Sequence, residues 1–153
     1  QIKDKVNNKY EALIKPYSTT CGIHVRRGDY IGNNFYEVCN LEYYNDAISE
    51  IKSRANIDLF LVFSDDISYC KEKLKGENFL FIENNSDIED LYLMAHHRNH
   101  NIICNSSFSW WAGWLNNNPN KIVIAPDRWY NDESKTIKDL VPENWIKINI
   151  KKQ

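Results

Sequence analysis

The sequence lacks long hydrophobic runs, and it has few glycines and prolines. Its 153 residues include five glycines and four prolines, and they form no low-complexity tract or internal repeat. No apolar run approaches the length that spans a bilayer, and the first residues, "QIKDKVNNKYEALIKPY", lack the apolar core and cleavage site of a signal peptide. We therefore expect a soluble, cytoplasmic chain of bacterial origin without a membrane span; membrane association of a longer protein stays open.

The sequence also lacks an excess of charge and any close spacing of cysteines. The formal net charge of -2 at pH 7 gives no basic surface for nucleic acid or a membrane, so any anion must bind at a local site. The four cysteines form no C-x-x-C pair and have no histidines at zinc spacing. We expect buried free thiols and no metal, with disulfides or metal ligands as the alternative.

What the sequence does contain is a series of short, nearly continuous apolar runs. Such runs are typical of strands that are covered on both faces, as in a parallel sheet. Segments with helical spacing lie between them, for example 41–51 and 88–95, the second preceded by the capping candidates Ser86 and Asp87. The alternation predicts an α/β fold: one doubly wound, Rossmann-like three-layer domain over residues 1–153. The runs are "CGIHV", "IDLFLVFS", "NFLFI", "NIIC" and "KIVIA".

The tail after Pro126 is more irregular than the rest of the sequence. We expect it to pack back over the sheet through apolar side chains. Those side chains are Trp129, Leu140, Trp145 and Ile148.

A charged cluster follows the first run, where ligands bind in open α/β sheets. Strand alternation places His24 and Arg26 on one side and Arg27 on the other. An arginine fork matches phosphate oxygens, Gly28 permits a tight turn, and Asp29 can pair with an arginine or cap the next turn. The alternatives are structural salt bridges and an adhesion tripeptide, Arg27-Gly28-Asp29.

Polar clusters also follow the second and fourth runs. Asp65 and Asp66 could hold Mg²⁺, hydrogen-bond a nucleotide base or ribose, or cap a helix that begins near Ile67. The segment "NSSFSWWAGWL" predicts a turn and a helix capped by Ser107 or Ser109, and the free amides of that helix suit phosphate.

Two further groups of side chains are read as structural. We expect the tryptophans of the helix after the fourth run to pack it onto the sheet rather than to stack on a sugar. Among the three histidines of "HHRNH" a zinc pair is possible, but a solvated helix end is favoured, since no H-E-x-x-H arrangement is present. The residues concerned are Trp110, Trp111, Trp114, His96, His97 and His100.

The motifs, taken in order, resemble the carboxyl half of the α-1,2-fucosyltransferases of glycosyltransferase family 11. They extend from Cys21 to Ile148 and read "HVRRGDY", "LEYYNDAI", "FSDD", "DLYLMAHHRNHNIICNSSFSWWAGWL", "APDRWY" and "VPENWIKI". The resemblance implies one half of a GT-B-like glycosyltransferase, an inverting enzyme that needs no metal or other cofactor. Its donor substrate would be GDP-fucose and its acceptor a galactose-terminated glycan.

The resemblance also implies roles for individual residues. Arg26 would hold the β-phosphate with support from His24 and Arg27, an aspartate of the pair Asp65 and Asp66 would contact guanine or ribose, and Asp29 is a candidate general base. The turn would line the diphosphate or base pocket through Asn105, Ser106, Ser107, Phe108 and Ser109.

Family members are near twice this length, so the resemblance implies that the acceptor-binding, amino-terminal half is absent here. We expect the chain to bind GDP or GDP-fucose without transferring fucose by itself. The alternatives are a transferase domain for another nucleotide sugar, a non-catalytic nucleotide-binding domain and an adhesion module.

Overall fold

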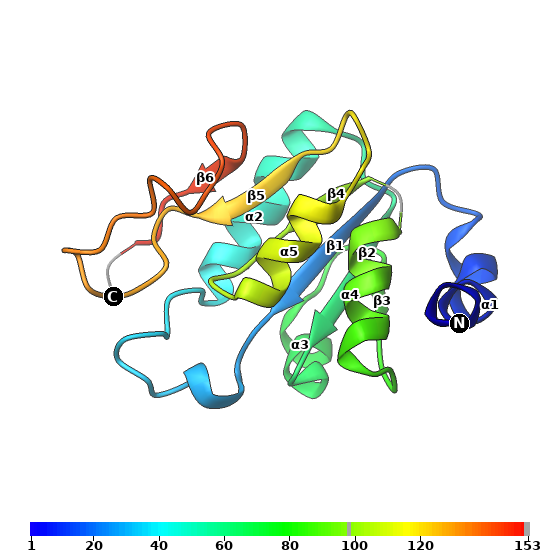
Figure 1. Ribbon diagram of the computed structural model, residues 1–153, viewed down its shortest axis with the longest axis horizontal. Coiled ribbons are helices and arrows are strands. Elements are labelled where there is room, and N and C mark those ends of the chain that lie inside the picture. Colours follow the sequence, from blue (N-terminus) through cyan, green and yellow to red (C-terminus); the bar gives the residue numbers. More distant parts are fainter. Residues whose placement is uncertain (98, 152–153) are drawn as a thin grey trace.

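The computed structural model, which describes residues 1–97 and 99–151, is built around a six-stranded parallel sheet (Figure 1). Its strand order is β3-β2-β1-β4-β5-β6, the order of doubly wound dinucleotide-binding folds. Every neighbouring pair of strands is parallel. The strands are β1 (Thr20–Val25), β2 (Leu59–Ser64), β3 (Phe79–Phe81), β4 (His100–Ile102), β5 (Val123–Pro126) and β6 (Ile146–Ile148).

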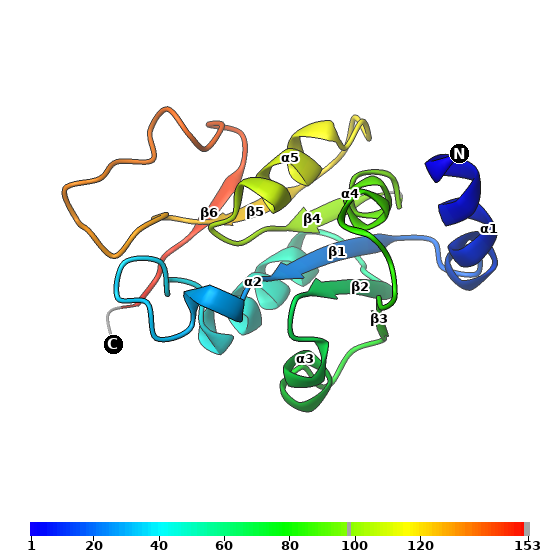
Figure 2. The ribbon, with the colours of Figure 1, turned by 60° about the horizontal axis from the view of Figure 1, so that its bottom comes forward.

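Helices cover both faces of the sheet and complete three layers (Figure 2). One face carries α2 and α3, and the other carries α4 and α5, with α1 packed on α4. This arrangement confirms the predicted α/β, Rossmann-like fold. The helices are α1 (Ile2–Ile14), α2 (Leu41–Arg54), α3 (Ile67–Lys73), α4 (Asp87–His96) and α5 (Ser107–Leu115), and a single 3-10 turn, η1, spans Gly28–Tyr30.

The continuous apolar runs form strands because both of their faces are buried. In β2, Phe60 and Val62 join the core on the α2 side, whereas Leu61 and Phe63 join the core beneath α1, α4 and α5. The alternation of a strand thus supplies two separate cores from one run of apolar residues.

Three of the helices begin with a side-chain cap. Ser86 forms a capping box with Glu89 at the start of α4, as expected for this serine. Asp66 accepts a hydrogen bond from the Tyr69 amide at the start of α3, which confirms one of the roles considered for it. Asn40 accepts from the Tyr43 amide at the start of α2.

The predicted cap of α5 is wrong. Its N-cap is Ser106, which makes no side-chain capping bond, and Ser107 is already the first helical residue. The Ser109 hydroxyl is fully buried and turns back toward the strand end, where it contacts the backbone N and O atoms of Cys104. Ser109 therefore stabilises the turn instead of capping the helix.

The tail contains a strand that the sequence analysis did not predict. Trp129 and Trp145 are buried beside β5, and Leu140 packs against the same cluster, as expected. Ile148, however, belongs to β6, which extends the sheet next to β5 instead of covering it. The strand has only three residues and lies at the sheet edge, so it leaves almost no periodic signal.

All four cysteines are free thiols. Within residues 1–97 and 99–151, no group of three or more histidine, cysteine, aspartate or glutamate side chains is placed to hold a metal ion. None of the helices described is long and apolar enough to cross a membrane.

Candidate functional site

A cavity of about 380 Å³ lies at the carboxyl ends of β1, β2 and β4. This is the switch point of the sheet, where the connections from the two central strands, β1 and β4, leave toward opposite faces. We call it the strand-end cavity. It is lined by His24, Arg26, Tyr30, Phe63, Ser64, Asp65, Asp87, Asp90, Ser106, Ser107 and Phe108.

Arg26 supplies the positive charge of the strand-end cavity. Its Nη2 atom lies 2.6 Å from Asp29 Oδ1, and its Nη1 atom lies 3.5 Å from Asp65 Oδ2. The guanidinium carbon is 5.2 Å from the centre of the Tyr30 ring. Ion pairs exposed to this degree contribute little free energy to folding.

Arg27 points away from the cavity, as strand alternation predicts. Its Nε atom donates to Asp66 Oδ2 at 3.1 Å, and its guanidinium carbon lies 3.4 Å from the centre of the Tyr69 ring on α3. Its side chain does not line the cavity. The described contacts of Arg27 are structural, and a role in ligand binding stays a prediction.

Asp65, which follows β2, is held at the cavity wall by the backbone that follows the neighbouring strand β1. Its Oδ1 atom accepts a hydrogen bond of 2.8 Å from the Arg27 amide. A Cβ atom on Gly28 would collide with Asp65 Oδ2, so a larger residue there would require this carboxylate to shift. The carboxylates of Asp65 and Asp66 are thus engaged by arginines and amides, and Asp66 does not line the cavity.

His24 is a neutral group in this site. Burial lowers its pKa to about 3, and the positive charge of Arg26 acts in the same direction. Its Nδ1 atom is 3.4 Å from Cys104 Sγ, and its ring lies 5.2 Å from that of Phe108. A neutral imidazole offers a single hydrogen bond to a ligand and no charge.

The turn before α5 divides into two groups of residues. Ser106, Ser107 and Phe108 line the cavity at the helix N-terminus, where the first amides have no partner within the helix. Asn105 and Ser109 are buried and do not line it. The structure therefore brings three of the five predicted turn residues to the cavity.

Two acidic residues of the cavity were missed by the sequence analysis. Asp87 and Asp90 come from the first turn of α4 and line the cavity together with Arg26. Burial raises the pKa of Asp90, although its hydrogen bond from Asn85 opposes this. The third apolar run also ends at this edge of the sheet. The acidic segment "SDIED" that follows it could therefore have indicated that carboxylates lie near the cavity.

The expected solvated helix end at "HHRNH" is wrong for two of its histidines. Helix α4 ends at His96, which is exposed, but His97 and His100 are buried. His97 Nδ1 is 2.7 Å from Thr20 Oγ1, and His100 Nδ1 accepts from the Ile122 amide. Both rings are held at the amino-terminal end of the sheet. Arg98 of this motif lies outside the described residues.

The expected packing of all three tryptophans onto the sheet is also wrong. Trp110 is partly buried and donates through Nε1 to Leu140 O, but Trp111 and Trp114 are 50% and 54% exposed. The face of α5 that meets the sheet contains small residues: a Cβ on Gly113 would lie 3.1 Å from Val123 Cγ1. The helix approaches so closely that large side chains are directed outward.

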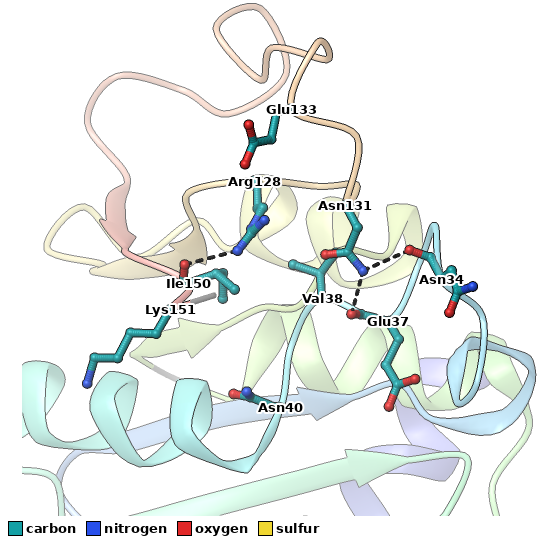
Figure 3. Close-up of a pocket in the computed structure, with 9 residues that line it drawn as sticks. All are labelled: Asn34, Glu37, Val38, Asn40, Arg128, Asn131, Glu133, Ile150 and Lys151. Atoms are coloured by element: carbon teal, nitrogen blue, oxygen red, sulfur yellow. Dashed lines mark hydrogen bonds between the residues drawn. The ribbon is translucent and has the colours of Figure 1, made fainter. Parts of the chain in front are cut away.

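A second cavity, of about 320 Å³, lies between the loop after β1 and the segment after β5 (Figure 3). Asn131 reaches across it and donates to the backbone oxygens of Asn34 and Glu37. Arg128 donates to Ile150 O. The side chains here hold two segments together, whereas the strand-end cavity gathers groups from three strand ends and two helix N-termini.

The fold and the strand-end cavity define a Rossmann-like α/β domain with an arginine-lined cavity at its switch point. The sequence matches the family Glycosyl transferase family 11 over residues 2–149, and the chain belongs to this family. The resemblance stated from the motifs is thereby confirmed.

The similar proteins are named as glycosyltransferases. The chain is 42% identical over 141 residues to the alpha-1,2-colitosyltransferase of Escherichia coli, covering 86% of this chain and 48% of that protein. It is 35% identical over 147 residues to the O-antigen biosynthesis glycosyltransferase WbnK of Escherichia coli, covering 91% and 48%. Galactoside alpha-(1,2)-fucosyltransferase 2 of Bos taurus is 29% identical over 107 residues, covering 64% and 31%.

The chain therefore spans about half the length of the two Escherichia coli relatives. No solved structure matches it.

Proposed function

We propose that this chain is the nucleotide-sugar-binding part of an inverting α-1,2-fucosyltransferase, one half of a GT-B-like enzyme, with GDP-fucose as donor and a galactose-terminated glycan as acceptor. The observation that carries the proposal is the position of Arg26 at the switch point, in the same cavity as the N-terminus of α5. A guanidinium and free helix amides together suit a diphosphate.

The acidic side of the cavity gives the donor a second point of recognition. Asp87 and Asp90 line the same cavity as Arg26, and carboxylates accept hydrogen bonds from ribose hydroxyls and from the N–H groups of guanine. A ligand with an anionic centre and a hydrogen-bond-donating end fits this distribution of charge. The resemblance implies this role for Asp65 or Asp66, whose carboxylate oxygens accept hydrogen bonds from Arg27 and from backbone amides.

Arg26 would act on the bond that breaks. In transfer, the bond between the fucosyl anomeric carbon and the β-phosphate oxygen breaks, and its electron pair stays on the phosphate. The acceptor hydroxyl attacks the anomeric carbon from the opposite face and gives its proton to a base, for which Asp29 is our candidate. A fixed guanidinium beside the phosphate is stabilising mainly in the transition state, an effect worth about 3 kcal/mol.

Titration calorimetry of the chain with GDP, GDP-fucose, UDP and UDP-sugars tests the donor assignment. We expect binding selective for guanine nucleotides, and about tenfold weaker binding of GDP-fucose by Arg26→Ala, because most of the stabilisation by this guanidinium comes only in the transition state. Arg128→Ala, an arginine of the second cavity, is the matched control and should bind as the unchanged chain does. Equal binding by Arg26→Ala, or equal binding of UDP and GDP, would contradict the proposal.

A second candidate is transfer of a different sugar through the same site. The alpha-1,2-colitosyltransferase relative, at 42% identity, favours this alternative. Competition between GDP-fucose and GDP-colitose in the same titration separates the two candidates.

A further inference from the structure

Four aromatic side chains form a continuous cluster beside the strand-end cavity, and we call it the aromatic platform. It consists of Tyr30, Phe35, Tyr36 and Tyr130, which come from the loop after β1 and the segment after β5. The ring centres of Tyr30 and Tyr36 are 5.3 Å apart, those of Phe35 and Tyr36 are 4.9 Å apart, and those of Phe35 and Tyr130 are 4.8 Å apart. In Figures 1 and 2 these two segments lie at the same end of the molecule, beyond the carboxyl ends of the strands.

The platform is exposed but held in place by the backbone of its two segments. Phe35 and Tyr36 are 36% and 38% exposed, so their rings are available to a ligand. Buried Asn105 donates through Nδ2 to both Tyr36 O and Trp129 O at 2.9 Å, and the Asn131 amide donates to Phe35 O. A ligand that binds there does not have to order the loops first, which lowers the cost of binding.

The platform is continuous with the cavity that we assign to the donor. Tyr30 belongs to both: it lines the strand-end cavity, and its ring lies 5.2 Å from the Arg26 guanidinium. Asp29, whose side chain is largely exposed, pairs with Arg26 at the same junction. A hydroxyl that attacks the donor sugar must come from a ligand bound next to the diphosphate site, and the platform occupies such a position.

We infer that the aromatic platform binds a pyranose of the acceptor glycan; the inference rests on the proposed function. A pyranose has C–H groups on its faces and hydroxyl groups around its edge. Exposed aromatic rings can cover an apolar face, while nearby polar groups such as Asp29 accept hydrogen bonds from the hydroxyls. The chain thus carries a part of the acceptor site as well as the donor site.

Saturation-transfer NMR of the GDP-saturated chain with methyl β-D-galactoside tests this inference. We expect transfer to the ring C–H protons of the sugar, with affinity about three- to tenfold lower in Phe35→Ala and in Tyr36→Leu. Trp111→Ala, which removes an exposed ring of α5 outside both cavities, should bind the sugar unchanged. Both platform variants should still bind GDP-fucose, which also shows that they are folded.

Three outcomes would overturn the inference: no sugar binding by a chain that binds GDP, unchanged affinity in the platform variants, or loss of binding in Trp111→Ala. Failure of the unchanged chain to bind GDP is a different result, because it contradicts the proposed function and not only the platform. The two substitutions affect neighbouring rings, so either of them suffices if the other prevents folding.

Discussion

At the scale of single residues, charge in the strand-end cavity is set by burial as well as by residue type. Arg26 keeps its charge because two carboxylates and solvent surround it. His24 comes two residues earlier on the same side of β1, yet burial lowers its pKa so far that it is neutral at any working pH. If the proposed donor binds here, Arg26 is its fixed cation, and the affinity should not depend on the charge of His24.

The buried histidines predict a loss of stability in mild acid. Burial lowers the pKa values of both His24 and His97 to about 3, whereas a histidine in the unfolded chain has a pKa near 6.5. Below about pH 6.5 the unfolded chain binds protons that the folded chain does not, so stability falls as pH falls. From about pH 7 to about pH 5.5, each ring should remove about 1.2 kcal/mol from the free energy of unfolding.

Urea unfolding at the two pH values measures this loss. In His97→Gln about 1.2 kcal/mol of the drop should disappear, whereas His96→Gln, which changes an exposed ring, should retain most of it. A chain that is equally stable at both pH values would show that these imidazoles are not buried as described.

The sequence predicted the direction of some side chains correctly and the burial of others wrongly, for a physical reason. Strand alternation is a local rule, so the separation of Arg26 from Arg27 could be read directly. The exposure of Trp111 could not, because it depends on how closely Gly113 allows α5 to approach β5. Hydrophobicity alone predicts burial, but a large side chain is buried only where the neighbouring element leaves space.

At the scale of elements, two helix N-termini meet the cavity with opposite chemistry. Helix α5 brings a serine-rich turn with free amides, and α4 brings the carboxylates Asp87 and Asp90. The capping box of Ser86 and Glu89 fixes the first turn of α4 and therefore the positions of both carboxylates.

Removal of this cap should lower the stability of the folded protein measurably. Ser86→Ala loses the bond to the Glu89 amide, and we expect a decrease of about 1 kcal/mol in the free energy of unfolding. Ser53→Ala is the matched control, because this exposed serine lies inside α2 and caps no helix, so its effect should stay near zero. Urea unfolding compares the two variants, and equal effects would contradict a specific role for the cap.

Strands and helices between residues 20 and 126 could be predicted because each repeats an apolar pattern over several residues. Strand β6 could not, since its three residues gain their hydrogen bonds only from β5, far away in the sequence. The N-cap of α5, predicted at Ser107 or Ser109, is Ser106 for a similar reason: Ser109 bonds to the strand end at Cys104, a contact that no local capping rule contains.

At the scale of the whole molecule, the strand-end cavity is an open site formed by one edge of one sheet. The proposed acceptor platform adjoins it, and the residues that line the cavity come from the strand ends, the loop after β1 and the starts of α4 and α5, so a separate domain would be needed as a cover. Relatives about twice as long have additional chain that can supply such a cover. We therefore expect this chain to suffice for binding the donor, whereas transfer of the sugar requires the additional chain of the longer proteins.

We predict that the purified 153-residue chain binds GDP-fucose but does not transfer fucose to lactose. Orientation of two bound reactants and exclusion of water can supply about 7–11 kcal/mol of a reaction barrier, and an open site provides little of either. Calorimetry measures binding, and chromatographic detection of fucosylated lactose measures transfer, with a full-length family 11 fucosyltransferase as the positive control. Efficient transfer by the chain itself would show that residues 1–153 already form a complete acceptor site, and the proposed division of roles between the two halves would then be wrong.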